Sequence, residues 1–149
     1  MRRSRQLMLT LALALGASAC DEKLSTLAGP TPNLEPTFAS IQRDIFETTD
    51  VAGRVSCVTC HTNQGRTPAG GMNLVHDLAY DQLVNVNSTQ VPSLKRVNPG
   101  NPDASYMAHK IEGRPGIVGR RMPFNGPPYL SDGQILIMRR WIELGAPRN

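Results

Sequence analysis

Two cysteines and a histidine near the middle of the chain stand at a spacing with a chemistry of its own. They read Cys57-Val58-Thr59-Cys60-His61, the pattern Cys-x-x-Cys-His. Two intervening residues let both thiols add across the vinyl groups at one edge of a porphyrin, and the next imidazole can turn under the ring to bind its iron. The spacing therefore predicts one covalently attached haem c, held through Cys57 and Cys60, with His61 as an iron ligand.

The same two thiols have other chemistries, namely a disulfide, a redox dithiol or half of a zinc site. A zinc site needs two more ligands, and the three cysteines and three histidines of the chain offer no second pair at a suitable spacing. A thioredoxin-like site would follow a strand, whereas a helix is expected ahead of Cys57. Haem attachment is therefore the favoured interpretation.

A haem iron bound by one histidine has a sixth position, and its occupant decides between electron transfer and ligand chemistry. Met122 lies in a Pro-rich loop from Arg120 to Pro128, which has no helical periodicity and is suited to hold a thioether against the second haem face. The alternative is that Met122 is only a buried loop residue. The full set of candidates is Met72, Met107, Met122, Met138, His76 and His109.

Four of these candidates have a simpler interpretation. Met138 falls on the apolar stripe of an expected helix, where methionine commonly fills core space. Met72 follows His61 closely, so we expect it on the same side of the haem. His76 and His109 are expected as surface or capping histidines. Met122 is therefore the predicted second ligand.

The N-terminus has the pattern of an export signal. Arg2, Arg3 and Arg5 form a basic region, residues 7–17 are apolar, and small residues precede Cys20. Small residues before a cysteine also resemble a bacterial lipobox, in which Cys20 becomes the acylated first residue. The alternative is cleavage near Ala19 with Cys20 left as a free thiol, which is uncommon in exported proteins. We expect a lipoprotein signal at 1–19 and a lipid-anchored protein on the periplasmic side of the membrane.

The net charge of +4 depends largely on that signal. Removal of residues 1–19 leaves thirteen basic and twelve acidic side chains, a net charge of +1. Two haem propionates would then make the protein mildly acidic. The basic pI is therefore no argument for nucleic acid as a partner.

The remaining sequence predicts a flexible tether at 20–36 and one domain at 37–149. Apolar residues recur at helical spacing over 37–49, and short helices are expected over 77–86 and 102–112, the second with Asn101 as N-cap and Gly113 just past its end. Leu78, Leu83 and Val84 are expected to point inward from 77–86. Ser131 and Gln134 form a capping box before a last helix. No convincing strand is visible, so the fold class is all-α.

The order of these features resembles the class I cytochrome c family. The shared features are a first helix, Cys57-Val58-Thr59-Cys60-His61, a loop, short helices, Met122-Pro123 and a final helix with Trp141-Ile142-Glu143-Leu144-Gly145-Ala146. The resemblance covers nearly all of 37–147 and implies a cytochrome c-like helical fold wrapped around one haem. The segment 86–119 is longer than in the shortest family members.

The resemblance also implies roles for particular residues. His61 is implied as the proximal iron ligand and Met122 as the distal one, with the first and last helices crossing beside the haem. A backbone carbonyl shortly after the haem motif is implied to accept the imidazole N–H of His61. In the family it often belongs to a proline in a Gly-Pro-Asn-Leu-like run; here the matching run is Gly71-Met72-Asn73-Leu74, whose Leu74 is implied to pack against the ring.

Two functions of a haem protein stay open at this point. A six-coordinate His/Met haem favours single-electron transfer with redox protein partners, such as a dehydrogenase or a respiratory complex. A labile sixth ligand would instead favour a peroxidase or a gas-ligand sensor. A peroxidase needs a distal acid–base group, for which His109 is the one candidate, with Arg114, Arg120 or Arg121 as charge partners.

Overall fold

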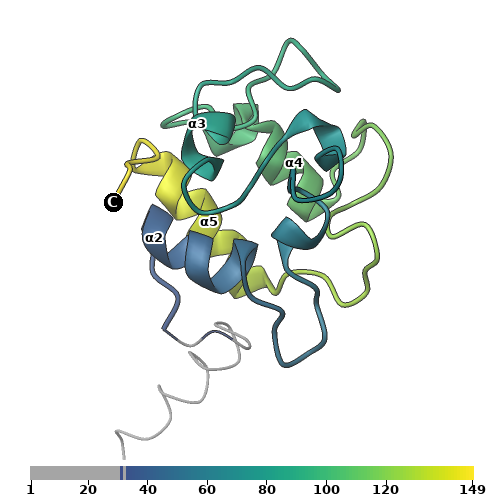
Figure 1. The fold of residues 1–149 in the computed structure, drawn as a ribbon. Helices are drawn as coiled ribbons and strands as arrows, with labels where there is room; N and C mark the ends of the chain where they lie inside the picture. The colour runs from purple at the N-terminus through teal and green to yellow at the C-terminus, as the bar shows by residue number, and fades with distance from the viewer. Residues whose placement is uncertain (1–30, 32) are drawn as a thin grey trace, which may run out of the picture.

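The computed structural model describes residue 31 and residues 33–149. The expected signal segment 1–19, Cys20 and most of the expected tether lie outside the described residues. In the described part, short helices are joined by long loops (Figure 1), and no strand forms beyond isolated bridges such as Val84–Val97. No helix in that part is both long and apolar enough to span a bilayer.

The first helix forms where its apolar periodicity predicts. It consists of α2 (Phe38–Ile41), which begins at the N-cap Thr37, and a wider π-helical turn, η1 (Gln42–Phe46). Ile41 and Ile45 are fully buried. The expected helix at 37–49 is thus confirmed, although it ends at Phe46.

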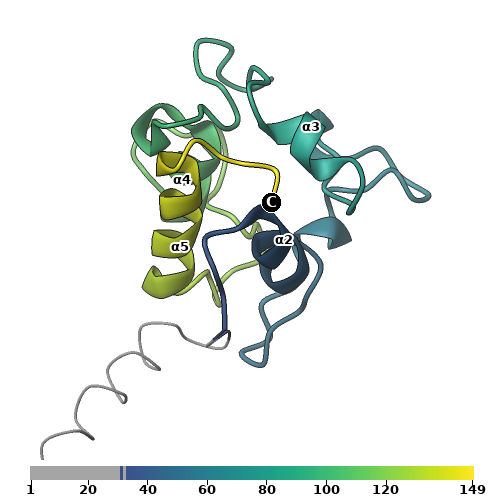
Figure 2. The same cartoon turned by 90° about the vertical axis from the view of Figure 1, so that its left-hand side faces the viewer.

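The last helix, α5 (Asp132–Glu143), begins at the predicted capping box. Its stripe of Met138, Trp141 and Ile142 is buried. The ring centroids of Trp141 and Phe38 lie 5.6 Å apart, so the first and last helices meet in the core. The views in Figures 1 and 2 agree in placing α2 beside the C-terminal segment, where the amide of Ala39 donates to the carbonyl of Asn149 at 2.8 Å.

The second expected helix is shorter than predicted. The structure has only α3 (Ala79–Leu83), and Leu83 is buried whereas Leu78 is 42% exposed. The expectation that Leu78 points inward is therefore wrong. The helix stops because the chain turns to pair with Val97. The amide of Asn85 donates to the carbonyl of Val97 at 3.0 Å, and the amide of Val97 donates to the carbonyl of Leu83 at 3.1 Å.

The third expected helix is interrupted. A single 3₁₀ turn, η4 (Pro102–Ala104), and the helix α4 (Tyr106–Glu112) are separated by Ser105, whose φ and ψ are −105° and 113°. The buried hydroxyl of Ser105 accepts the amide of Asn98 and donates to the carbonyl of Asn101, both at 2.8 Å. These bonds fix the interruption. The predicted N-cap Asn101 and the left-handed Gly113, with φ of 74°, are confirmed.

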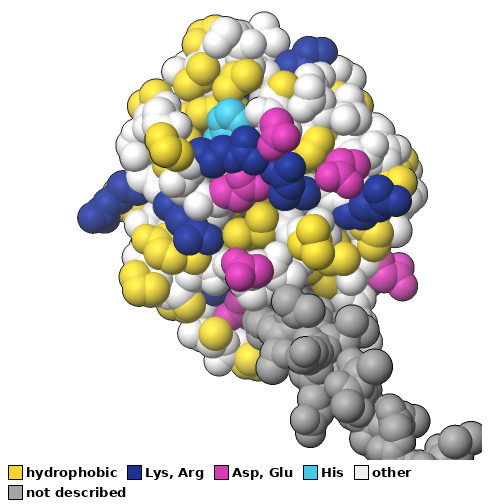
Figure 3. Space-filling model, turned by 180° about the vertical axis from the view of Figure 1, so that it is seen from behind, with side chains coloured by type: hydrophobic (Ala, Val, Ile, Leu, Met, Phe, Trp, Pro, Cys, Tyr) yellow, Lys and Arg dark blue, Asp and Glu magenta, His cyan; other side chains and the backbone are white. Residues whose placement is uncertain are grey.

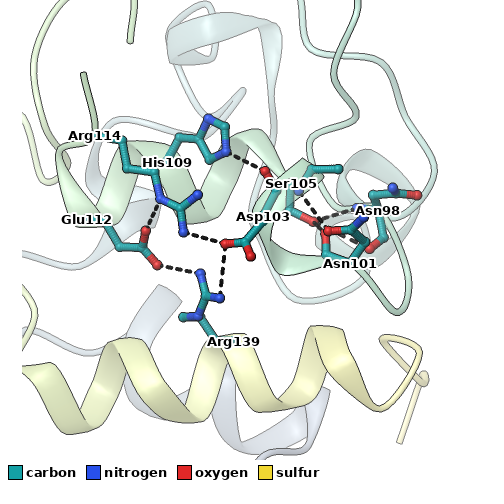
Figure 4. Close-up of polar contacts among 9 residues, drawn as sticks. Asn98, Asn101, Asp103, Ser105, His109, Glu112, Arg114 and Arg139 are labelled. Atoms are coloured by element: carbon teal, nitrogen blue, oxygen red, sulfur yellow. Dashed lines mark hydrogen bonds and ion pairs between the residues drawn. The ribbon is translucent and has the colours of Figure 1, made fainter. Parts of the chain in front are cut away.

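An ion-pair cluster joins α4 and α5 on the outer face of the molecule. Arg139 of α5 donates to Glu112 at 2.9 Å and to Asp103 at 3.1 Å, and Arg114 pairs with the same two carboxylates (Figure 4). Figure 3 shows basic and acidic side chains next to one another on this face. The charges here are therefore locally balanced.

Candidate functional site

A cavity of about 400 Å³ opens in the middle of the fold, with a mainly apolar lining. It lies between η1, the segment with the two cysteines, α4 and the loop before α5. A volume of this size is typical of small-molecule and cofactor sites. The structure brings all five sequence-predicted cofactor-binding residues to its walls: Cys57, Cys60, His61, Leu74 and Met122.

The segment with the two cysteines is a single tight turn, η2 (Cys57–Thr59). The carbonyl of Cys57 accepts the amides of Cys60 at 3.2 Å and His61 at 3.0 Å. The hydroxyls of Ser56 and Thr59 lie 2.9 Å apart and close the turn further. This compact turn directs both cysteines and the histidine to one wall of the cavity, and both thiols are free.

The ring of His61 is held by a backbone carbonyl. Its Nδ1 lies 2.8 Å from the carbonyl oxygen of Ala69. Because a carbonyl can only accept, Nδ1 is the protonated nitrogen, and Nε2 retains its lone pair for a metal. A carbonyl acceptor shortly after His61 is thus present, as the resemblance implies, but it belongs to Ala69 in η3 (Ala69–Gly71) and lies ahead of the matching run Gly71-Met72-Asn73-Leu74.

Burial also keeps His61 in the form that binds metals. Burial lowers the pKa of the imidazole, and the positive charges of Arg96 and Lys110 lower it further. The hydrogen bond to the Ala69 carbonyl opposes this shift in the pKa. The neutral ring is therefore favoured down to lower pH than in an exposed histidine, and a neutral imidazole is the ligand that a metal needs.

The thiol of Cys57 is unlike that of a redox-active cysteine. Burial raises its pKa to about 11, and the nearby charge of Arg54 opposes this only in part. Catalytic and redox thiols have a lowered pKa, because the thiolate is the nucleophile. The environment of Cys57 therefore does not favour a redox dithiol.

The structure narrows the list of candidate sixth ligands without reducing it to one. Met72, Met107, Met122 and Met138 all line the cavity. His76 and His109 do not line it. His76 is exposed beside Asp77, whose carboxylate raises the pKa of the imidazole. Nε2 of His109 lies 2.7 Å from the carbonyl oxygen of Asp103 (Figure 4). His109 therefore does not supply the acid–base group that a peroxidase would need at the cavity.

Basic side chains line the cavity, a feature that sequence reasoning missed. Arg66, Arg96 and Lys110 contribute to its walls, and no Asp or Glu does so among the described residues. Arg96 is 8% exposed and donates to the carbonyls of Gly71 at 3.0 Å and Gln82 at 2.7 Å. Burial lowers the pKa of Arg96 and of Lys110. The cavity is therefore suited to a ligand that combines an apolar body with anionic groups.

Much of the cavity wall around Arg96 comes from the long segment 86–119. Ser88, Thr89, Gln90 and Tyr106 line the cavity beside Arg96, and the Tyr106 hydroxyl donates to the Gln90 side chain at 3.1 Å. The segment therefore closes one side of the cavity. Its polar residues show no periodicity in the sequence, so no pattern marks them as cavity residues.

These residues fit a haem in three respects. Two free thiols and an imidazole with an available Nε2 share one wall, thioethers are present for a second iron ligand, and the lining combines apolar surface with cations that could pair with carboxylates. In the described part of the chain, no group of three or more His, Cys, Asp or Glu side chains is arranged to hold a bare metal ion.

No family model, no curated protein and no solved structure matches this chain. Its function must therefore be inferred from the geometry of the cavity and from the sequence pattern.

Proposed function

We propose that this chain is a monohaem c-type cytochrome that transfers single electrons, with a cytochrome c-like helical fold around the haem. The observation on which this rests is the convergence of Cys57, Cys60, His61 and Met122 on one apolar cavity. A bound haem would supply an iron that changes its oxidation state by one electron. Both thiols would attach the haem, and His61 and Met122 would bind its iron.

The chain's own residues have separate tasks in this proposal. Ala69 orients the His61 ring so that Nε2 faces away from the backbone bond. Leu74, only 3% exposed, and the other apolar side chains of the cavity exclude water and provide a low-dielectric surrounding. With both His61 and Met122 bound, the iron would have no open site for a substrate, which favours electron transfer over ligand chemistry.

The decisive experiment is an optical spectrum of the protein exported from a host with haem-attachment machinery. We expect a sharp c-type spectrum on reduction, a weak sulfur-to-iron band near the red end of the ferric spectrum, and no response of the ferrous protein to carbon monoxide. Rapid binding of carbon monoxide would favour a peroxidase or gas sensor. A protein without haem would contradict the proposal.

The proposal includes export and anchoring of the chain on the periplasmic side through an acylated Cys20. Its partners would then be redox proteins at that membrane, such as a dehydrogenase or a respiratory complex. We expect Cys20→Ser to move the protein from the membrane fraction to the soluble periplasmic fraction, because the acyl chains attach to that thiol. Cys20→Ser protein that stays in the membrane fraction would contradict the anchor.

A further inference from the structure

The loop that contains Met122 has no regular structure of its own, and it is held to α4 by Lys110. The ammonium group of Lys110 donates to the carbonyls of Val118 at 2.8 Å and Arg120 at 2.6 Å. The carbonyl of Lys110 accepts the amide of Met122 at 2.8 Å. Lys110 thus contacts this loop through both its side chain and its main chain, immediately before and at Met122.

Neighbouring contacts keep the same stretch against α4. The guanidinium Nε of Arg121 donates to the carbonyl of Ile111 at 2.8 Å, and the amide of Val118 donates to the Tyr106 hydroxyl at 2.9 Å. A Cβ at Gly113 would lie 2.9 Å from Cδ of Arg121, so the Arg121 side chain packs directly against this glycine. Residues 118–122 are therefore docked on the last turns of α4.

Lys110 is buried without an ion pair to any described residue. The residue is 8% exposed, and no carboxylate lies within ion-pair distance of it among residues 33–149. The loop that it holds contains Arg120 and Arg121, whose charges repel an ammonium. Burial of the ammonium is unfavourable by itself, and the two carbonyl oxygens offset that cost through charge-assisted hydrogen bonds. Its defined effect is to fix the main chain that leads to Met122.

We propose that Lys110 is a positioning residue for the sixth iron ligand: it holds residues 118–120 so that the Met122 thioether stays at the haem. This inference rests on the proposed haem function. Without the two bonds from the ammonium, residues 118–122 would keep three hydrogen bonds to α4, those to the Tyr106 hydroxyl and to the carbonyls of Ile111 and Lys110. The thioether would then leave the iron more readily and open the sixth position.

The test compares three variants of the haem-loaded, full-length protein. Lys110→Met keeps the length and apolar stem of the side chain but removes its donors. Lys110→Arg keeps a cation with several N–H donors and is the rescue variant. Lys95→Met removes a lysine that does not line the cavity and whose ammonium donates to the side chain of Asn85 at 2.6 Å. It therefore controls for the same substitution, with loss of one positive charge, away from the Met122 loop.

We expect Lys110→Met to keep its haem and its c-type reduced spectrum but to weaken the red-end ferric band and bind carbon monoxide about tenfold or more tightly, as loss of a charge-assisted bond implies. Lys110→Arg and Lys95→Met should keep the band. An unchanged band and carbon monoxide affinity in Lys110→Met would overturn the proposal. If Lys110→Met loses its haem, Lys110→Gln is used in its place, because its side chain is too short to reach both carbonyls. The expected result is the same.

Trypsin provides a readout that does not depend on the spectrum, since Arg120 and Arg121 lie within the held segment. We expect faster cleavage after these arginines in Lys110→Met than in wild type or Lys95→Met, and equal cleavage rates would overturn the proposal. A wild-type protein with no c-type spectrum contradicts the haem function itself, whereas a normal wild-type spectrum with an insensitive Lys110 contradicts only the role of Lys110.

Discussion

At the scale of single residues, the surroundings of the Cys57 thiol argue against a redox role for this cysteine. Burial that raises its pKa to about 11 keeps it protonated at neutral pH. An ordinary thiol, with a pKa of about 8.5, is partly ionised at pH 8. The folded chain without haem therefore presents a poor nucleophile at this position.

This leads to a pH-dependent prediction for protein made without haem attachment. Alkylation of Cys57 by iodoacetamide at pH 8 should be about 100-fold slower in the folded chain than in urea, because only about one thiol in a thousand is ionised. The rate should climb until the pH reaches about 11. The modified peptide is followed by mass spectrometry. Equal rates with and without urea would show that Cys57 is not protected.

The same shift links stability to pH with a definite sign. The folded chain keeps the Cys57 proton that the unfolded chain loses above its lower pKa, so the unfolded state binds fewer protons there. The contribution of this thiol to the free energy of unfolding is therefore complete below about pH 8 and falls as the pH rises toward 11.

The choice among the thioethers can also be tested residue by residue. Met122→Ala should abolish the red-end ferric band and open the iron to carbon monoxide, whereas Met107→Ala and Met138→Ala should leave both unchanged. Met107 is the sharpest control, since it also lines the cavity and comes from α4. Loss of the band in Met107→Ala alone would transfer the ligand role to Met107.

At the scale of elements, a buried ion pair organises the loop between η1 and η2. Nε of Arg54 lies 2.9 Å from Oδ2 of Asp50, with side chains 0% and 3% exposed. The second carboxylate oxygen of Asp50 accepts the amides of Ala52 and Arg54. The pair therefore shapes the main chain that enters the turn at Cys57.

Removal of one partner should be costly, because it leaves an uncompensated buried charge. We expect Asp50→Ala to lower the free energy of unfolding by about 3–5 kcal/mol. Asp81→Ala is the matched control: its pair with Arg148 is exposed on both sides, and such pairs contribute about 0–1 kcal/mol. Urea unfolding of both variants, followed by circular dichroism, measures the difference. Similar losses in the two variants would refute the structural importance of the buried pair.

At the scale of the whole molecule, charge is unevenly distributed. The face over α4 and α5 pairs its basic and acidic groups (Figure 3), whereas the segments 53–72, 82–102 and 113–131 around the cavity contain no Asp or Glu. Arg120, in the last of these, is exposed, with its guanidinium 5.3 Å from the centre of the Phe124 ring. The segments around the cavity therefore carry basic side chains, among them Arg66, Arg96 and Arg120, that make no ion pair within the described residues.

This asymmetry predicts how the haem-loaded protein reacts with small redox reagents. Oxidation by anionic ferricyanide should slow as ionic strength rises, because salt screens the attraction. At low salt, Arg120→Gln should lower the rate about two- to fivefold. Arg148→Gln changes the net charge equally but removes a charge paired with Asp81, and it should have a smaller effect. Stopped-flow measurements make the comparison, and equal effects would indicate that only net charge matters.

The sequence by itself determined the local features, because their causes are local. The Ser131–Gln134 capping box, the left-handed Gly113 and the apolar stripe through Met138 and Trp141 each depend on residues within one or two turns. These elements form where the sequence pattern places them.

The tertiary structure decided what depends on contacts between distant segments. Helix 77–86 ends early because Leu83 and Asn85 pair with Val97, and helix 102–112 breaks because Ser105 bonds to Asn98. The same holds for the site. Four methionines from different segments reach one cavity. Lys110 holds the Met122 loop through hydrogen bonds to residues 8–12 positions further along the chain. Spacing in the sequence encodes neighbours along the chain, whereas these contacts exist only once the chain has folded back on itself.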